Sequence, residues 1–505
     1  MHRYAGGAAR WPRRLAGWLS AVIGGPARTR AVLLLAGVLA LNSANAGTIG
    51  AVANQLERDL HINHGQLGLL SGVSAAIGAL ISLPVGVLAD RTVRVRVLVV
   101  TIVIWSGSML AAGLATSYLW LLLAQVALGA ALAAASPVVA SLVGDLFPPA
   151  ERARTFGWIL SGELLGAGFG LLVGGDIAAV LSWRYAFFLL AAASLGLAGA
   201  VWRRMPEPQR GGASWIPHGA AAIPLADNDQ APAGEARNDQ APAGEAPRTG
   251  DSDRSGDSVI AIIGRAGVTP DDARTLREPA RELPLWRSVR YLLSIPTNRI
   301  LILASAGGYF FFAGLRTFTA IFVERQFNIS QTELSGLVPI VGLGALAGVI
   351  LGGRLTDTAL RRGAISARVV APAIGFGAAG LLFAPGLFSS TLWVALPLFT
   401  AGAAALASTN PPLDAARLDI VPGGLWGRAE SVRTVLRLTA EAAAPPAFGF
   451  IADALGGGTG RTSHSAGLRD AFLIMLIPLL ANGALVLATR RTYPADVATA
   501  ARGTG

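Results

Sequence analysis

Long runs of apolar residues, separated by short polar segments, dominate the chain. A helix that crosses a bilayer needs ~20 such residues. Six runs of about this length lie in the first part of the chain, at residues 31–51, 67–89, 97–115, 119–143, 156–177 and 183–202. Six more follow at residues 300–323, 333–354, 366–385, 391–410, 429–452 and 470–489. The pattern predicts an all-α polytopic membrane protein with twelve transmembrane helices in two six-helix halves.

Three segments fall outside these runs. Residues 1–30 are basic and carry an apolar stripe at helical spacing, which favours an interfacial helix over a cleaved signal peptide. Residues 203–295 form a polar central loop in which the stretch 228–236 is copied at 238–246, and this low-complexity composition predicts partial disorder. Residues 491–505 form a short tail. The domain boundaries expected are therefore 1–30, 31–202, 203–295, 296–490 and 491–505.

The charge pattern orients the helices in the membrane. The net charge is +11, and every basic residue other than histidine is arginine. Arginines are frequent in alternate loops and scarce in the others, which predicts that both termini and the central loop are cytoplasmic in a plasma membrane. Their scatter over the ends of apolar runs argues against nucleic-acid binding. The chain has no cysteine, and its five histidines lie outside the apolar runs, so we expect neither a metal site nor a cofactor.

A short charged motif occurs twice, at residues 86–96 and 353–362. Each copy has a glycine, an acid four residues later and then arginines: Gly86, Asp90, Arg91 and Arg94 in the first, and Gly353, Asp357 and Arg361 in the second. The spacing puts the glycine and the acid on one helical face. The glycine permits close approach of another helix, and the acid can meet an arginine or a helix N-terminus. We interpret the motif as a conformational latch.

The two halves match elsewhere as well. Asp145 and Arg152 follow the fourth apolar run, and Asp419 and Arg428 follow the tenth in the same order. Such matching predicts an internal duplication of six plus six helices. We include Asp145 and Arg152 in the predicted latch.

These residues resemble the major facilitator superfamily. The resemblance rests on the two six-helix halves, the repeated Gly-x-x-x-Asp motif and the stretches 145–152 and 183–187. The opening of the chain is faintly similar to the spinster-type branch, and drug-efflux branches are also similar. There are departures: Val93 stands where the family usually has glycine, and Asn45 and Ala46 stand where the spinster-type branch usually has an acid and an arginine. The resemblance implies alternating access by a monomeric transporter.

Two carboxyl groups at membrane depth are candidates for proton coupling. Glu163 lies about seven residues into the fifth run, and Glu441 occupies a comparable place in the eleventh. Charged groups at this depth are costly and are usually functional. Both could carry a proton or bind a cation. Glu441 could instead form a structural ion pair with Arg437, one helical turn earlier.

Other polar residues at depth are candidates for a substrate cavity. They include Asn42, Asn45, Gln125 and Arg316. The resemblance implies that the first and seventh spans face the substrate, which supports Asn45 and adds Tyr309 as a candidate. Arg316 could be a counter-ion to Glu163 or Glu441, an anchor for an anionic substrate, or a side chain that reaches the outer interface beside Glu324. The amides could serve only in hydrogen bonds between helices.

The preferred hypothesis is a secondary active transporter that exports small amphipathic compounds through a largely apolar cavity, driven by protons. Uptake symport of an organic anion is the alternative, based on Arg316. A polytopic enzyme or sensor is a remote third, because no catalytic cluster or folded loop domain is visible in the sequence. No nucleotide-binding Gly-x-x-x-x-Gly-Lys-Ser/Thr loop occurs, so ATP is not expected to drive transport directly.

Overall fold

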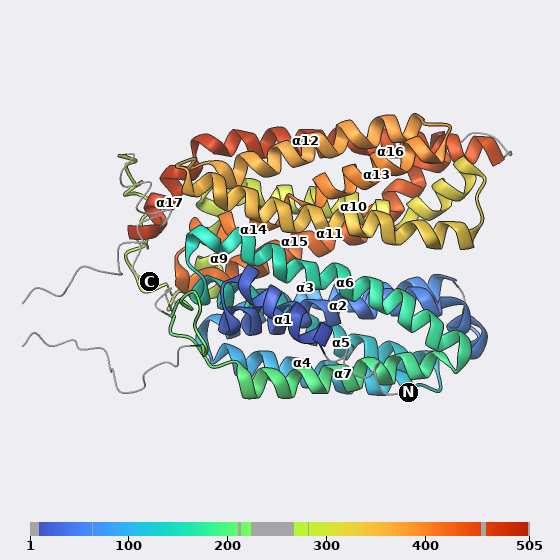
Figure 1. Ribbon diagram of the computed structural model, residues 1–505, viewed down its shortest axis with the longest axis horizontal. Coiled ribbons are helices and arrows are strands. Elements are labelled where there is room, and N and C mark those ends of the chain that lie inside the picture. Colours follow the sequence, from blue (N-terminus) through green and yellow to red (C-terminus); the bar gives the residue numbers. More distant parts are fainter. Residues whose placement is uncertain are drawn as a thin grey trace, which may run out of the picture.

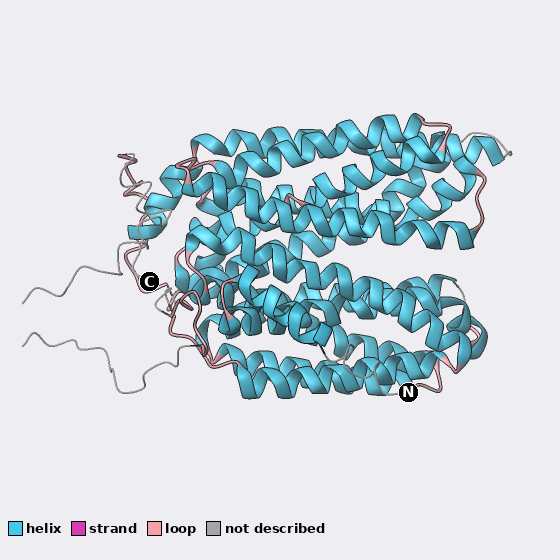
Figure 2. Ribbon diagram, viewed as in Figure 1, coloured by secondary structure: helices cyan, strands magenta, loops and turns pink. Residues whose placement is uncertain are grey.

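The computed structural model describes residues 10–62, 64–210, 214–223, 267–280, 282–455 and 461–502. This part of the chain is helical and contains no strand (Figure 2). Two groups of long helices lie side by side, blue to green in one half and yellow to red in the other (Figure 1). The copied stretch at 228–246 and the glycines at 456–458 lie outside the described residues.

The twelve predicted membrane helices are confirmed. The N-terminal half consists of α2 (Pro26–Leu60), α3 (His64–Arg91), α4 (Arg94–Gly113), α5 (Tyr118–Leu146), α6 (Arg152–Val180) and α7 (Trp183–Arg204). The C-terminal half consists of α10 (Pro296–Phe327), α11 (Gln331–Arg361), α12 (Ala367–Phe388), α13 (Leu392–Ala407) with α14 (Asn410–Asp419), α15 (Trp426–Leu455) and α16 (Arg461–Ala488). In the described residues, ten stretches are long and apolar enough to cross a bilayer. The charged helices α6 and α15 complete the two sets of six.

The tenth span is longer than the sequence pattern predicts, and it is broken. Helix α13 ends at Ala407, and α14 then runs from Asn410 to Asp419, whereas the apolar run ends near residue 410. Pro411 and Pro412 occupy the first turn of α14, where a missing backbone N–H costs nothing. The prolines therefore begin a second short helix instead of ending the span. Asp414 and Arg417 lie within it.

Short helices flank the two halves. They are α1 (Arg10–Ile23), η1 (Pro149–Glu151), α9 (Leu285–Ser294), η3 (Gly423–Leu425), η4 (Thr489–Arg491) and α17 (Tyr493–Arg502). The helix expected within residues 1–30 is present as α1, and α9 lies at the end of the central segment.

Small residues allow the closest helix contacts. On α6, Gly162, Gly166 and Gly170 face the backbone of Ala36, Ala40 and Ala44 on α2 so closely that no Cβ atom would fit. On α11, Gly344, Gly348 and Gly352 face α13 in the same way. Such stripes provide association between helices in lipid, where there is no hydrophobic driving force.

The halves meet mainly through α3 against α15 and α6 against α11. Close approaches between them join Gly86 to Ser431 and Gly353 to Ala153. Both lie near the end of the bundle at which α3 and α11 finish, at the left of Figure 1. We call this the latch end, and the opposite end the far end.

The central segment binds to the latch end both before and after its undescribed middle. We call residues 205–223 its first arm and residues 267–284 its second arm. From the first arm, Arg210 donates hydrogen bonds to the carbonyl groups of Ala89, Asp90 and Thr92 at the end of α3. From the second arm, the carbonyl of Leu283 accepts from Arg91 at 3.3 Å. The carbonyl of Ala280 accepts from Arg428 at 3.1 Å. The link between the halves therefore touches both sides of the junction.

Candidate functional site

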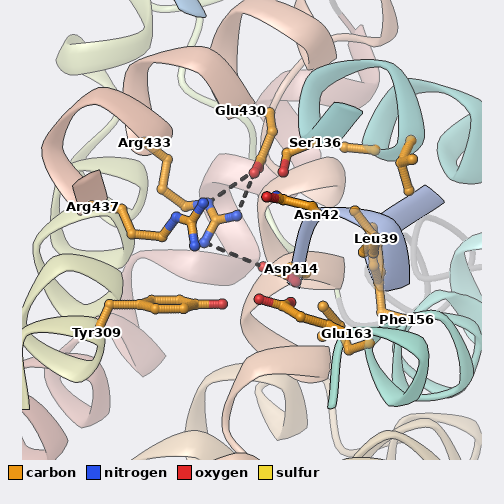
Figure 3. Close-up of a pocket in the computed structure, with 13 residues that line it drawn as sticks. Leu39, Asn42, Ser136, Phe156, Glu163, Tyr309, Asp414, Glu430, Arg433 and Arg437 are labelled. Atoms are coloured by element: carbon orange, nitrogen blue, oxygen red, sulfur yellow. Dashed lines mark hydrogen bonds and ion pairs between the residues drawn. The ribbon is translucent and has the colours of Figure 1, made fainter. Parts of the chain in front are cut away.

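A small cavity lies between the two halves, deep in the bundle. It is lined by Leu39, Asn42, Ser136, Val139, Ala140, Phe156, Leu160, Glu163, Tyr309, Asp414, Glu430, Arg433 and Arg437. Figure 3 shows these side chains converging from helices of both halves. Its volume is about 30 Å³, enough for water but not for an organic substrate. The lining combines charged and polar side chains with apolar ones, whereas the sequence led us to expect a largely apolar cavity.

Four charges in the C-terminal half form a closed network beside the cavity. Arg433 pairs with Glu430 and lies 4.0 Å from Asp414. Arg417 pairs with Asp414 and, at 3.1 Å, with Glu430. Arg433 also donates to Ser305 Oγ on α10 at 2.9 Å. Because two guanidinium groups meet two carboxylates, the network is electrically balanced, as a buried set of charges needs to be.

A second pair lies one turn farther along α15. Arg437 donates to Glu441 over 3.1 Å. Its guanidinium carbon lies 4.6 Å from the centre of the Tyr309 ring, in a cation–π geometry. The Nε atom of Arg437 is buried and has no hydrogen-bond partner in the described part of the chain. Glu441 is thus engaged in the ion pair that the sequence offered as its structural interpretation, and it does not line the cavity.

Glu163 differs from the other carboxyl groups around the cavity. It lines the space from α6, in the opposite half, and it has no ion pair or hydrogen bond with any residue that the structure describes. In Figure 3 its carboxyl group and the hydroxyl of Tyr309 point toward one another. Four carboxyl groups in this region therefore face three arginines, and Glu163 is the one left without an arginine.

The predicted amides divide into two groups. Asn42 lines the cavity from α2. Asn45 and Gln125 do not line it, and they are buried at 3% and 1% exposure. In each, the side-chain oxygen has no hydrogen-bond partner among the described residues.

Arg316 also lies outside the cavity lining. It is exposed and has no ion pair within the described ranges. It follows Tyr309 by seven residues on α10, which places it on the same helical face about 10 Å nearer the far end. The structure brings Glu163, Asn42 and Tyr309 together around the cavity. Arg316 lies nearer the far end and does not join them.

The first copy of the latch joins the two halves. Asp90, at the end of α3, accepts hydrogen bonds from the backbone N–H groups of Gly427 at 2.9 Å and Arg428 at 3.0 Å. These groups begin α15, so the carboxylate caps the positive end of that helix. A Cβ atom on Gly86 would lie 2.9 Å from Cβ of Ser431, which explains the glycine one turn earlier.

The second copy repeats this arrangement with the halves exchanged. Asp357, at the end of α11, accepts from the backbone N–H of Arg154 on α6 at 2.7 Å and from Arg368 at 3.2 Å. A Cβ atom on Gly353 would lie 2.8 Å from the carbonyl carbon of Ala153. Arg361 is exposed and donates to Thr358 within its own helix at 3.3 Å.

Buried ion pairs support both copies. Arg94 pairs with Asp145, and also with Glu207 of the central segment at 2.8 Å. The matching pair in the other half joins Arg368 to Asp419. Arg152 reaches Asp419 across the halves at 3.3 Å. The arginine that meets the end of the fourth span is thus Arg94.

Outside the spans, Tyr493 on α17 donates a hydrogen bond to Asp419 at 2.7 Å. Burial, and then the carboxylate of Asp419, raise the pKa of the Tyr493 hydroxyl well above its usual range, so it stays protonated and can donate. Helix α17 thereby attaches to the same carboxylate that receives Arg152 and Arg368.

Sequence reasoning missed the network of Asp414, Arg417, Glu430 and Arg433. The available signal is two pairs of opposite charges, each three residues apart, both after the end of the apolar tenth run. Because the apolar run ends near residue 410, these charges were assigned to a loop and a helix start.

A family model described as Major Facilitator Superfamily matches residues 33–429. A hexuronate transporter from Bacillus subtilis (strain 168) is 30% identical over 171 residues, which are 34% of this chain and 39% of that protein. Protein spinster homolog 3 from Danio rerio is 29% identical over 185 residues, 36% of this chain and 37% of that protein. The matched region is thus well under two thirds of the length of these two relatives.

Among solved structures, a bacterial homologue of the human lysosomal transporter Spinster, inward-facing and unoccupied, superposes with a TM-score of 0.54. The match covers 92% of this chain and 97% of that one at 20% sequence identity. At this identity the match shows a shared fold.

Proposed function

Because the chain belongs to the Major Facilitator Superfamily, we propose that it is a secondary active transporter that carries a small organic anion together with a proton. Family and fold are those of a multi-pass membrane transporter rather than an enzyme. The substrate, the proton and the direction are our inference from the cavity.

The observation that carries the proposal is that Glu163 lines the cavity without an arginine partner among the described residues. All other carboxyl groups around the cavity are paired with arginines, so their charges are balanced. Glu163 lines the cavity without such a partner in the described residues. It is therefore the lining group whose proton can come and go without breaking an ion pair.

An organic anion fits this arrangement when Glu163 is protonated. With Glu163 ionised, the region has one excess negative charge and repels a carboxylate substrate. Protonation removes that charge, and the substrate can then share Arg437, whose Nε is unpaired, and accept from Tyr309. Binding of the proton thus favours binding of the anion, and binding of the anion favours binding of the proton. A symporter requires this reciprocal coupling.

Two further observations agree with an anion. Arg316 is exposed on the Tyr309 face of α10, two turns toward the far end, where it could attract an anion on its way in. The Bacillus subtilis relative is named a hexuronate transporter, and hexuronates are organic anions.

Exchange of an organic cation for protons is the second candidate. An unpaired carboxylate at the cavity also suits a cation, which would compete with the proton for Glu163 instead of requiring it. Competition produces antiport, so the two candidates differ in the sign of the coupling. The charges around Glu163 are the same for both candidates, and only flux measurements can separate them.

The two halves are in contact at the latch end, and we propose that this end is closed and faces the cytoplasm of a cell whose plasma membrane the protein spans. Arginines gather there, among them Arg91, Arg96, Arg361, Arg362 and Arg490, in keeping with the positive-inside rule. Transport would then alternate between this state and one in which the latch is broken. A reporter inserted at Ser390, between α12 and α13, should read as external, and one at Ala364 as cytoplasmic. The reverse readings would overturn this orientation.

Flux in proteoliposomes tests the coupling. Labelled glucuronate is the probe for the anion, and tetraphenylphosphonium is the probe for a cation. An acidic outside solution should drive glucuronate accumulation by the unaltered protein. Glu163→Gln, which resembles the protonated acid, should keep glucuronate exchange across the membrane and lose accumulation driven by the pH gradient.

Glu324→Gln is the matched control, because Glu324 lies in α10 away from the cavity lining and should leave the accumulation unchanged. Gradient-driven accumulation that survives Glu163→Gln would overturn the coupling role of Glu163. Accumulation of tetraphenylphosphonium against an opposing proton gradient, with no glucuronate flux, would replace symport by exchange.

A further inference from the structure

A group of arginines lies where α6 meets α11 at the latch end, and it draws on both halves. Arg154 is on α6, and Arg354 and Arg361 are on α11. Arg354, Arg361 and Arg28 are among the charged groups that act on Arg154, together with the acid Glu151. We call Arg154, Arg354 and Arg361 the arginine cluster.

The acids near the arginine cluster already have other partners. Asp357 accepts from the backbone of Arg154 and from the buried side chain of Arg368. Glu151 pairs with Arg28 and lies 3.3 Å from His218. No ion pair joins an acid to a guanidinium group of the cluster in the described part of the chain. Like charges from the two halves therefore face each other at the junction.

An aromatic ring lies beside the arginine cluster. Trp158 follows Arg154 by one turn on α6, and the Arg354 guanidinium carbon lies 5.1 Å from its ring centre. This contact holds Arg354 across the junction between α6 and α11. Arg361 follows Arg354 by seven residues, so the two lie on one face of α11 about 10 Å apart along its axis.

The surface beside the arginine cluster is apolar. Leu351 and Leu355, on either side of Arg354 in the sequence, are 51% and 67% exposed. With Leu343, which is 65% exposed, they follow an i, i+8, i+12 spacing that turns one stripe of α11 outward. A ligand that joins an anionic group to long apolar chains would suit both surfaces at once.

We propose that Arg154, Arg354 and Arg361 bind the phosphate of an anionic phospholipid in the leaflet at the latch end, with its acyl chains along Leu351 and Leu355. The bound phosphate bridges the two halves and removes the repulsion between their arginines. Since the cluster forms only where α6 and α11 meet, the lipid binds the latched state better than the open one and shifts the population toward it.

Spin-label distances test this proposal on the full-length protein in nanodiscs. The chain has no native cysteine, so Arg203→Cys on α7 and Ser294→Cys on α9 place one label on each half, at exposed positions. Adding phosphatidylglycerol to phosphatidylcholine discs should raise the latched population by roughly fivefold for each arginine engaged. Arg154→Gln with Arg354→Gln should abolish that response.

Arg96→Gln with Arg490→Gln is the matched control, because it removes two exposed arginines at the same end of the bundle. It should retain the response to phosphatidylglycerol. If both double variants lost the response to phosphatidylglycerol equally, only the general surface charge would matter and the proposal would be overturned. The absence of any response in the unaltered protein would also overturn it. Glycerol 3-phosphate in detergent solution should have no effect, and a full effect would assign the site to a free phosphate. If the double variant does not fold, Arg361→Gln at an exposed position provides the same comparison.

These outcomes are independent of the proposed transport reaction. A lipid response could be present in a protein that carries a cation, and a proton-coupled anion transporter could lack it. Flux variants at Glu163 and distance measurements at the arginine cluster therefore test the two proposals separately.

Discussion

The carboxylate of Asp90 accepts a hydrogen bond from the backbone N–H of Arg428 over 3.0 Å, across the boundary between the two halves. Its second oxygen accepts from Gly427 at 2.9 Å. Asp90→Ala should remove both bonds. Each bond to a charged group contributes ~1.5–3 kcal/mol, so the latched state should lose at least tenfold in population. Distances between labels at Arg203→Cys and Ser294→Cys should lengthen.

The control for this change is Asp470→Asn. Asp470 forms a half-exposed ion pair with Arg469, away from the latch, and exposed pairs contribute little. An unchanged distance distribution in Asp90→Ala would show that the capping bonds do not hold the latch.

Gly353 should tolerate no side chain. Its three nearest neighbours across the junction are backbone atoms of Ala153 and Arg154, which cannot rotate away. Gly353→Ala should therefore destabilise the latched state by ~1–3 kcal/mol, the usual cost of overpacking. Gly107→Ala on α4 is the control, because no atom lies within 4 Å of the Cβ position there. Equal label distances in the two variants would contradict the steric argument.

Arg94 should matter more for stability than its exposed neighbour Arg96. It is fully buried between Asp145, Glu207 and Ser141 Oγ, which is 3.0 Å away. Arg94→Ala leaves a buried carboxylate without its arginine, which typically costs ~3–5 kcal/mol. Thermal unfolding in detergent should show a clear loss for Arg94→Ala and almost none for Arg96→Ala. Similar melting temperatures for the two would mean that Arg94 does not stabilise the fold.

His218 should make the attachment of residues 214–223 depend on pH. It lies 3.1 Å from Arg28 and 3.3 Å from Glu151. Burial lowers the pKa of His218, with Arg28, Arg154 and Arg361 acting in the same direction and Glu151 opposing them. The detached segment therefore binds a proton more readily than the attached one, so attachment is fully stable above pH ~6.5 and weakens as the pH falls through the lowered pKa.

Maleimide labelling measures this attachment. Ser214→Cys places a thiol at a buried position of the segment in an otherwise cysteine-free chain. Labelling should accelerate on acidification and lose that acceleration in His218→Gln. The effect should be modest, because the His218 side chain is 59% exposed. An identical pH profile with and without His218 would assign the change to another group.

The sequence predicts the twelve helices and the two glycine–acid motifs because both are local properties. Apolar length along the chain decides whether a helix can span the bilayer, and Gly86 with Asp90, or Gly353 with Asp357, lie on one helical face. Which helix end each acid caps depends on how the halves dock. The sequence predicts an arginine or a helix N-terminus, and Asp90 and Asp357 both meet helix N-termini.

The cavity was less predictable. Glu163 and Tyr309 could be selected because a charge or a hydroxyl stands alone in an apolar run. The network of Asp414 and Arg433 could not, since it requires α14 to continue the tenth span past Pro411. The packing of α14 near α15 shows that these charges are balanced. Because they are balanced, Glu163 stands out as the carboxyl group without an arginine partner in the described residues.

The central segment is attached through Arg210 at one end and through Ala280 and Leu283 at the other, so the covalent link is tied to both sides of the junction between the halves. Two separately expressed half-proteins would therefore have to retain their own arms to reassemble with a working latch. A break between residues 223 and 267 keeps both anchors, whereas a break at residue 206 strands Arg210 on the wrong fragment. We therefore expect reassembly of the halves to depend on the two attached ends of the central segment and not on its length.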